Sequence, residues 1–413
     1  MPLNKKRFLI IAPNTFPSDH SFLENVFVKT FPKAGHEVFF ILNGLDHVFP
    51  WKIEKWGATT VFVRPRVKQK SLLNRFLNSV LIRLNTFLIL LLVFRVRPDI
   101  IFVRSELFPC LIAITFSVLS KKKIKVCYHY NWPLYEKTLL KLKRIKDLGT
   151  LLKKIERLFQ QFLLSIVFNK ADYIFTISEA MRNMLILEGR INGKKVSALP
   201  LAANVIEDLS LKYLPWRQSI RQKLSLKNKF ITIYIGSLDE LREPEILIET
   251  TIYAKEFVGM NFHLLIVGAT SEQKRALLQK ANVRGVSDYI TIMERIKRES
   301  IAEFICAADV GFSPIPVIPI FEISSPTKIY EYMAAGCPFV SSKIPEVVSL
   351  LEKSRAGLLS DHNARSYAAA IKIFYEDEDL RKRCGREGLR FTQEIHNYEI
   401  LSYNFLQKIT NYE

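Results

Sequence analysis

At 413 residues, with 49% apolar and 24% charged side chains, the chain has the composition of a globular protein and the length of two domains. Its five cysteines are scattered and form no CxxC pair, which disfavours a disulfide framework or a zinc site and favours a reducing compartment. The net charge of +20 lies entirely in the first half, because residues 1–200 hold 33 Lys and Arg against 13 Asp and Glu, whereas residues 201–413 hold 27 of each. This asymmetry predicts that one domain faces a polyanion or an anionic membrane.

The amino-terminal segment MPLNKKRFLIIAPNTF places a basic cluster before an apolar run. That run, Phe8 to Ala12, is shorter than the about 7–15 residues of a signal-peptide core, so we expect a first buried strand instead. The longest apolar run, Phe87 to Phe94, is far below the about 20 residues that span a bilayer. We therefore expect no transmembrane helix, and a cytoplasmic protein that associates peripherally with the inner face of the cell membrane.

Short runs rich in β-branched or aromatic residues alternate with helical segments, which is the pattern of β-α-β units in a parallel sheet. In the first half the expected elements are the strands Arg7–Ala12, Glu37–Leu42, Thr60–Val63, Asp99–Val103, Lys125–Tyr130 and Tyr173–Ile177, and a helix at Phe22–Lys33. The second half starts again with the strands Phe230–Ile235, Phe262–Val267, Tyr289–Met293 and Val310–Ser313, and the helices Glu245–Glu256, Ser271–Ala281 and Ser300–Cys306. The fold class predicted is α/β, with two Rossmann-like doubly wound domains facing a central cleft and joined near Leu199–Trp216, where Pro200, Pro215 and Trp216 interrupt the periodicity.

A basic amphipathic stretch runs from Lys137 to Arg157, where cations alternate with leucines. The apolar residues that follow a helical period here are Leu148, Leu152, Ile155, Phe159 and Phe162. Such a stretch can lie in the headgroup layer of a membrane, with each cation contributing about 1 kcal/mol near an anionic surface. A core helix with a solvated basic face explains this stretch alone equally well. The charge of the whole first half favours the membrane.

Nucleic acid is the other polyanion that a basic domain could bind. The sequence contains no zinc finger, no RNP motif and no basic region followed by heptads. We therefore expect no nucleic-acid partner.

The segment SSPTKIYEYMAAG, Ser324 to Gly336, has the form of a short helix closed by glycine. Ser324 or Ser325 can cap it, and its free N–H groups favour a phosphate. Lys328 adds a cation, and Glu331, three residues on and on the same face, can accept hydrogen bonds from the vicinal hydroxyls of a ribose. A nucleoside diphosphate laid across the helix start is one interpretation. A simple Lys328–Glu331 ion pair on a well-capped surface helix is the other, and for this segment alone it is at least as good.

Several segments succeed one another along most of the chain: KAGHEVFFI, ADYIFTISEAM, VSALPLAAN, YIGSLDELREPEILIE, LLIVGA, AADVGFSP and KIYEYMAAGCPFV. In this order they resemble the retaining glycosyltransferases of family 4, which have the GT-B fold. The resemblance implies an acceptor domain (1–205), a nucleotide-sugar domain (206–395) and a closing helix (396–413) that crosses back to the first domain. It also implies transfer of a sugar from a UDP- or GDP-sugar to a lipid-linked or glycan acceptor with retention of configuration, without cofactor or metal.

The resemblance also implies roles for particular residues. Glu331 is the second glutamate of the family's E-x7-E motif and the expected ribose ligand, whereas the first falls on Ile323, which cannot bind sugar hydroxyls. In the phosphate loop, Ser237 and Arg242 stand where the family has an arginine and a lysine, so we expect Lys328 to supply the missing cation. The expected donor-binding residues are Gly236, Ser237, Arg242, Ser325, Thr327, Lys328 and Glu331.

The catalytic candidate is His129 in CYHYNWP, which matches the family's histidine beside the reacting sugar. Without the resemblance, a histidine at a strand end is more often a structural residue. Asp19 and His20 lie where the family has a glycine pair and are the acceptor-side candidates. Asp377-Glu378-Asp379 has the spelling of a metal-binding DxD motif, but it follows an expected helix, and we expect a solvated helix terminus there.

Two other classes of function remain open at this point. A sugar-nucleotide epimerase of the same fold would use the same nucleotide site but would not need a basic, amphipathic first domain. A non-enzymatic protein that binds membrane or nucleic acid would explain the charge but not the nucleotide-like second domain.

Overall fold

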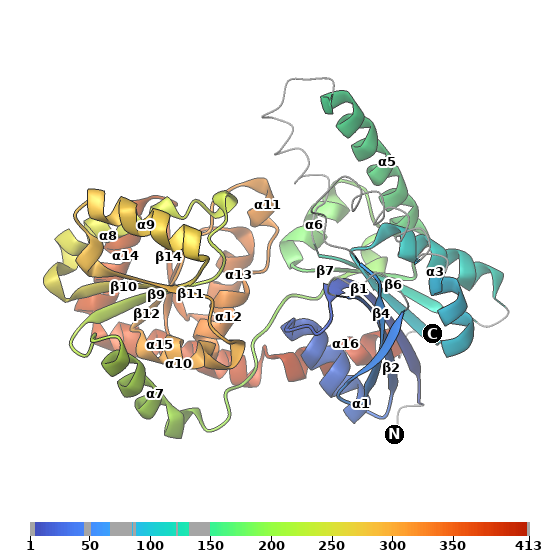
Figure 1. Ribbon diagram of the computed structural model, residues 1–413, viewed down its shortest axis with the longest axis horizontal. Helices are drawn as coiled ribbons and strands as arrows, with labels where there is room; N and C mark the ends of the chain where they lie inside the picture. The colour runs from blue at the N-terminus through green and yellow to red at the C-terminus, as the bar shows by residue number, and fades with distance from the viewer. Residues whose placement is uncertain are drawn as a thin grey trace. The chain divides into compact units, whose positions relative to one another are not determined.

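The structure is a computed structural model that describes residues 5–44, 51–66, 85, 88–120, 123–131 and 149–410. It divides into two compact units (Figure 1). Unit 1 consists of Met1–Pro200 and Leu401–Glu413, and unit 2 of Leu201–Ile400.

Unit 1 is built on a sheet which, among the described residues, has eight strands in the order β3-β4-β2-β1-β5-β6-β7-β8. The strands are β1 (Arg7–Thr15), β2 (Glu37–Asn43), β3 (Lys52–Trp56), β4 (Thr59–Arg64), β5 (Ile100–Arg104), β6 (Lys125–Tyr130), β7 (Tyr173–Thr176) and β8 (Val196–Ala198). Only β3 runs antiparallel to its neighbour, and the other neighbouring pairs are parallel. The central strands are almost fully buried, as expected for a parallel sheet covered by helices.

Helices follow the strands of unit 1 in turn. They are a π-helix (Leu23–Thr30) continued by α1 (Phe31–Lys33), α3 (Leu107–Leu119), α5 (Gly149–Lys170), α6 (Glu179–Leu187) and most of α16 (Tyr398–Thr410). Phe405 of α16 packs among the core rings of Phe27, Phe31, Phe102 and Phe175, with centroid distances of 4.9–6.0 Å. The end of the chain is therefore part of the core of unit 1.

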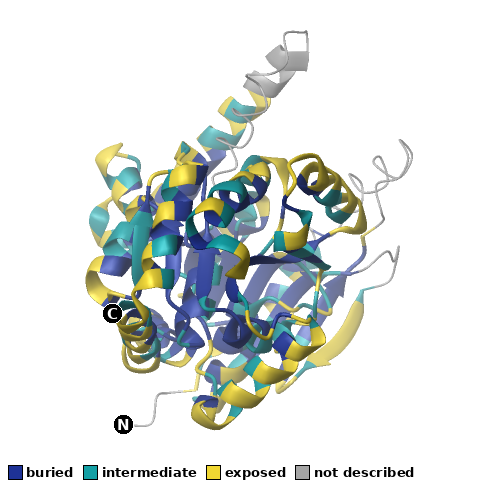
Figure 2. Cartoon of the chain, turned by 90° about the vertical axis from the view of Figure 1, so that its left-hand side faces the viewer, coloured by how far each residue is buried: buried dark blue, intermediate teal, exposed yellow. Residues whose placement is uncertain are grey.

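Unit 2 holds a six-stranded, all-parallel sheet in the order β11-β10-β9-β12-β13-β14, counted over its described residues. The strands are β9 (Phe230–Ile235), β10 (Phe262–Ala269), β11 (Ile290–Glu294), β12 (Val310–Ser313), β13 (Phe339–Ser342) and β14 (Gly357–Ser360). The helices are α7 (Leu209–Lys223), α8 (Glu245–Val258), α9 (Ser271–Val283), α10 (Ile301–Ala307), α11 (Pro319–Glu322), α12 (Thr327–Ala334), α13 (Pro345–Ser354), α14 (Ala364–Glu376) and α15 (Glu378–Glu394). The central strands β9, β10, β12 and β13 are almost fully buried, while the outer faces of the helices are exposed (Figure 2).

The predicted fold, two α/β units with parallel sheets, is confirmed, and the predicted strands lie within one to three residues of the observed ones. One expectation is wrong. Pro215 and Trp216 do not interrupt the periodicity at a joint between the domains, because both lie inside the helix α7. Proline costs least in the first turn of a helix, but Pro215 stands in the second, so the packing of α7 against the rest of unit 2 must outweigh its cost.

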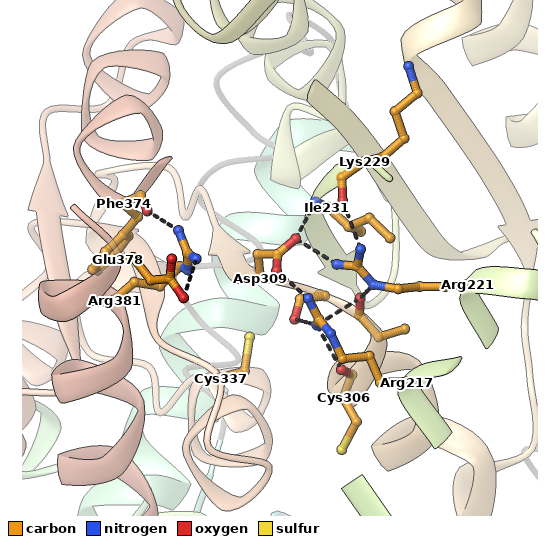
Figure 3. A network of polar contacts seen from close by, with 12 residues as sticks. Arg217, Arg221, Lys229, Ile231, Cys306, Asp309, Cys337, Phe374, Glu378 and Arg381 are labelled. Atoms are coloured by element: carbon orange, nitrogen blue, oxygen red, sulfur yellow. Dashed lines mark hydrogen bonds and ion pairs between the residues drawn. The ribbon is translucent and has the colours of Figure 1, made fainter. Parts of the chain in front are cut away.

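A polar network holds α7 in place (Figure 3). The Asp309 carboxylate accepts hydrogen bonds from Arg217 at 2.5 Å, from Arg221 at 2.7 Å and from the Ile231 N–H at 2.7 Å. Both arginines also donate to backbone carbonyls around Ala307 and Ala308. The carboxylate of Asp309, the residue that precedes β12, thus joins α7 to β9.

Candidate functional site

A glycine-containing turn follows β9 at the carboxyl edge of the unit 2 sheet. The Gly236 N–H donates to the Val267 carbonyl at 3.0 Å, and Gly236 has a φ of +150°. Gly268 lies so close that a Cβ on it would be 2.4 Å from the Gly236 carbonyl oxygen. The two glycines let the turn after β9 lie against the end of β10.

Helix α12 lies directly over the sheet beside this turn. Its Tyr332 hydroxyl donates to the Ile233 or Phe312 carbonyl, each 3.1 Å away, and accepts from the Ile235 N–H. A Cβ at Gly311 would be 2.4 Å from the Tyr332 ring, so only glycine admits this packing. Tyr332 therefore fixes the distance between α12 and the β9 turn.

The predicted serine cap of α12 is wrong. Pro326 is the N-cap residue, and no side chain caps the helix. The Ser325 hydroxyl accepts instead from the Leu201 N–H at 3.2 Å, and the Ser324 hydroxyl donates to the Phe321 carbonyl at 2.7 Å. Both hydroxyls are used by the loops on either side, which leaves the start of α12 without a side-chain cap.

Lys328 points back onto the β9 turn. Its Nζ lies 3.8 Å from the Tyr234 ring centroid, and a Cβ on Gly236 would be 3.2 Å from that Nζ. Burial, and then the charge of Arg242, hold the pKa of Lys328 well below its ordinary value. An anionic partner would stabilise the charged, ammonium form of Lys328 at this position.

Arg242 closes the turn from the other side. Its Nε donates to Asp239 at 2.9 Å, and its guanidinium lies over the Phe321 ring at 5.3 Å. Asp239 also accepts from the Ser237 hydroxyl at 3.3 Å. The Lys328 amine and the Arg242 guanidinium are thus close enough that the charge of Arg242 lowers the pKa of Lys328.

Glu331 lies one turn along α12 from Lys328. Burial raises the pKa of Glu331 to about 7, against the opposing charges of Arg298 and Lys328. Sequence reasoning missed Arg298, which begins a 3-10 helix after β11 and carries no motif of its own. The Glu331 side chain is half-buried, and hydrogen bonds from a ligand would stabilise its charged form.

The structure brings together Gly236, Ser237, Arg242, Lys328 and Glu331, all of which the sequence singled out. Ser325 is buried and bonded to Leu201, and Thr327 is the half-buried first residue of α12. Ile323 ends α11 with 6% of its surface exposed, so its side chain belongs to the protein interior.

His129 lies at the carboxyl end of β6 in unit 1, with none of its surface exposed. Its ring packs beside Phe22 at 5.2 Å and Phe102 at 5.6 Å, and neither ring nitrogen has a hydrogen-bond partner among the described residues. Burial, followed by the charges of Arg104 and His20, holds the pKa of His129 well below its ordinary value. The imidazole is therefore neutral.

The remaining residues at this edge of unit 1 come from several strand ends. Asp19 is exposed and His20 half-buried, both after β1. Arg104 ends β5 and donates to Asn14 at 3.1 Å, and Arg64 ends β4 and forms an ion pair with Glu106 at 2.8 Å. Sequence reasoning missed both arginines, although an arginine directly after a buried strand is a visible signal.

An apolar stripe on α5, which we call the α5 stripe, consists of Ile155, Leu158, Phe159 and Phe162. These side chains are 51–65% exposed. The neighbouring helix α3 exposes Phe108, Val118 and Leu119 as well. The cation-rich residues 137–148 of the predicted amphipathic stretch lie outside the described residues. Among the residues that the structure does describe, no helix is long and apolar enough to cross a membrane.

The DxD-like triplet has a structural role. Asp377 caps α15 by accepting from the Leu380 N–H at 2.8 Å, and Glu378 pairs with Lys382 at 2.8 Å. Within the described ranges, no group of three His, Cys, Asp or Glu side chains could hold a metal ion.

Two family models match the chain, one in each half. The model described as Glycosyltransferase Family 4 matches residues 26–205, and the model described as Glycosyl transferases group 1 matches residues 229–377. The second match contains the whole β9 turn and α12. A relative from Methanocaldococcus jannaschii, an uncharacterized glycosyltransferase, is 22% identical over 317 residues, which cover 74% of this chain and 73% of the relative.

Solved structures share the fold along nearly the whole chain. HepE of Anabaena, solved in complex with UDP-glucose, matches with a TM-score of 0.66 at 13% identity over 98% of this chain and 100% of its own. WaaG, a glycosyltransferase involved in lipopolysaccharide biosynthesis, matches with a TM-score of 0.67 at 12% identity over 98% of this chain and 100% of its own. At such identities the likeness shows the GT-B fold and nothing finer.

Proposed function

The chain belongs to the glycosyltransferases of group 1 and family 4, and we propose that it moves a sugar from a nucleoside diphosphate sugar to a membrane-associated acceptor, with retention of configuration and without a metal. One observation carries the proposal. Lys328 and Glu331, one turn apart on α12, have pKa values shifted in opposite directions beside a glycine turn. The UDP-glucose bound by HepE supports the choice of donor class.

The β9 turn and α12 provide the groups that a departing nucleoside diphosphate requires. Cleavage of the glycosyl phosphate bond places negative charge on the diphosphate, and fixed cations that already point there stabilise the transition state. Lys328 and Arg242 supply this charge, and the Gly236 backbone lets the phosphates approach closely. We assign the diphosphate to these groups.

Glu331 is the proposed ligand of the ribose hydroxyls. Only its charged form can accept hydrogen bonds from both hydroxyls. Because its pKa is raised to about 7 in the free protein, acid protonates it and weakens nucleotide binding. The ratio of wild-type to Glu331→Gln affinity should fall as the pH decreases below about 7, by up to about tenfold per pH unit.

The same shift affects folding with a defined sign. A carboxyl whose folded pKa lies above its unfolded value stabilises the protein most below the unfolded pKa and loses that contribution as the pH rises through about 7. Glu331→Gln should therefore flatten the stability profile of the free protein between about pH 4 and 7. If nucleotide affinity and melting temperature depend on pH in the same way in the wild type and in Glu331→Gln, then Glu331 is not the titrating group.

His129 is the proposed residue beside the reacting sugar. Its two ring nitrogens have no partner in the described structure, and such buried polar atoms are costly unless a ligand or a rearrangement satisfies them. Phe22 lies against the ring, so a sugar that contacts His129 must displace this side chain. A neutral imidazole there can orient a hydroxyl by hydrogen bonding.

The acceptor is proposed to lie at an anionic membrane that unit 1 contacts. The first 200 residues carry the whole excess of positive charge, and the α5 stripe exposes four large apolar side chains beside α3. Cations with exposed apolar groups suit the headgroup layer of an anionic bilayer. The biosynthetic role of WaaG supports an acceptor of the cell-envelope polysaccharide class.

A variant with Leu158→Glu and Phe162→Glu tests the membrane contact. Full burial of each side chain would contribute about 1.5–3 kcal/mol, so losing both should weaken binding to phosphatidylglycerol vesicles by about tenfold or more. Sedimentation with the vesicles measures it. The control is Met260→Glu, which changes an equally exposed apolar residue of unit 2 and should bind like the wild type. Equal binding by all three proteins would remove the α5 stripe from the contact.

The reaction itself is tested with a panel of UDP- and GDP-sugars and a lipid extract. We expect glycosylated lipid from one donor in the presence of EDTA, with the anomeric configuration of the donor by NMR. Epimerised donor in the absence of lipid would favour the epimerase alternative, and inversion or loss of activity in EDTA would contradict the corresponding part of the proposal.

A further inference from the structure

Glu243, the residue after Arg242, has an unusual backbone conformation. Its φ is +49° and its ψ is +58°, in the left-handed region, which costs a non-glycine residue roughly 1–2 kcal/mol. The residue joins the short 3-10 helix that carries Arg242 (Glu240–Arg242) to α8. Interactions of the Glu243 side chain must offset this cost, because the backbone alone disfavours it.

The Glu243 side chain is the first member of a hydrogen-bond chain, which we call the His362 chain. His362 Nε2 lies 3.1 Å from Glu243 Oε2, and His362 Nδ1 lies 2.8 Å from the Tyr367 hydroxyl. That hydroxyl lies 2.8 Å from Ser342 Oγ, which in turn bonds to the Ile315 carbonyl. Tyr367 and Ser342 are completely buried.

The His362 chain joins four loops at the carboxyl edge of the unit 2 sheet. Glu243 follows β9, Ile315 follows β12, Ser342 ends β13 and His362 follows β14. The segments after β9 and β12 also carry the proposed donor site. The outer end of the chain lies one residue from Arg242, and its inner end lies in the core.

We propose that His362 is a positioning residue for the donor site, which holds Glu243 in its left-handed conformation and thereby fixes Arg242 at the diphosphate. The inference rests on the proposed function, because it assigns His362 to the binding of the same donor. His362 acts through Glu243, the residue after Arg242, and is not one of the proposed donor ligands.

The structure suggests variants that remove the chain without unfolding the protein. In His362→Ala, Tyr367 can still donate to Ser342 and Ser342 to Ile315, so the buried contacts stay satisfied. In Glu243→Gly, the left-handed backbone becomes favourable while the carboxylate is lost. His362→Gln restores a donor at the position of Nε2 and serves as the conservative rescue.

The test compares steady-state kinetics of these variants, with melting temperatures to show that each folds. We expect His362→Ala to lower kcat for the donor by about tenfold with a smaller change in KM, because a misplaced cation mainly affects the transition state. His362→Gln should recover part of the loss, and His362→Ala should have no further effect in a Glu243→Gly background. Lys343→Ala is the control, since Lys343 pairs with Asp361 at 2.7 Å beside the chain but outside it.

Each result supports or overturns the inference. The inference is overturned if His362→Ala and Glu243→Gly have independent effects, or if a folded His362→Ala variant has an unchanged kcat. In either case, activity of the wild type leaves the proposed function intact. A wild type that neither binds nor uses any nucleotide sugar overturns both.

Discussion

Replacing Lys328 with methionine should lower kcat by about 10²–10³-fold, the effect of removing one preorganised donor from a developing negative charge. Lys328 is a half-buried lysine at the Gly236 turn, with its Nζ 3.8 Å from the Tyr234 ring centroid, and its lowered pKa reflects burial and the nearby charge of Arg242. Arg242 alone cannot neutralise a diphosphate. Initial rates at saturating donor measure the effect.

The fold should tolerate this change, so a loss of activity can be assigned to catalysis and not to unfolding. Methionine keeps the apolar stem of Lys328, and replacing a buried charge by an apolar group of similar volume is often neutral or stabilising. The control is Lys372→Ala, because Lys372 forms an exposed i,i+4 pair with Glu376 far along the chain from the site. Wild-type kinetics in a folded Lys328→Met protein would exclude Lys328 from the reaction.

Asp309→Ala should destabilise unit 2 by about 3–5 kcal/mol, the cost of removing one partner from a buried charge network. The carboxylate receives Arg217, Arg221 and the Ile231 N–H, and its loss leaves two arginines largely buried without their counter-charge (Figure 3). The start of β9 and the whole of α7 lose their common partner at once.

Denaturant unfolding followed by far-ultraviolet circular dichroism measures this loss. Glu378→Ala is the matched control, because Glu378 also pairs with an arginine, Arg381, but on the solvent-exposed surface. That variant should unfold at the wild-type midpoint. An Asp309→Ala midpoint close to the wild type would mean that α7 is held by apolar packing alone.

Local sequence patterns predicted the parts of the fold that local physics determines. The strands Phe230–Ile235 and Lys125–Tyr130 are continuous apolar or aromatic runs, and the structure has both within these bounds. The placement of Lys328 and Glu331 one turn apart on α12 follows from helical spacing. Lys52–Trp56 was not expected as a strand, because four of its five residues are exposed and it has no apolar run.

The parts that sequence reasoning missed depend on contacts between distant residues. Ser325 is a good helix cap by residue type, but Leu201, 124 positions away, uses its hydroxyl. Pro215 breaks helices by residue type, yet the Asp309 network holds the helix that contains it. Glu243 and His362 are 119 positions apart, so no local pattern could join them.

Calorimetric titration of UDP and GDP tests the central claim, that the β9 turn and α12 bind a nucleoside diphosphate, most directly. We predict that the wild type binds one of the two with a Kd between about 1 μM and 1 mM. We also predict that nucleotide binding by Glu331→Gln takes up protons, seen as a heat that depends on the buffer, because the diphosphate raises the lowered pKa of Lys328; in the wild type, proton release from Glu331 opposes this uptake. Lys328→Met should lose most of the affinity and the proton uptake attributable to Lys328. Absence of binding by the wild type, or equal binding by the variant, would contradict the account.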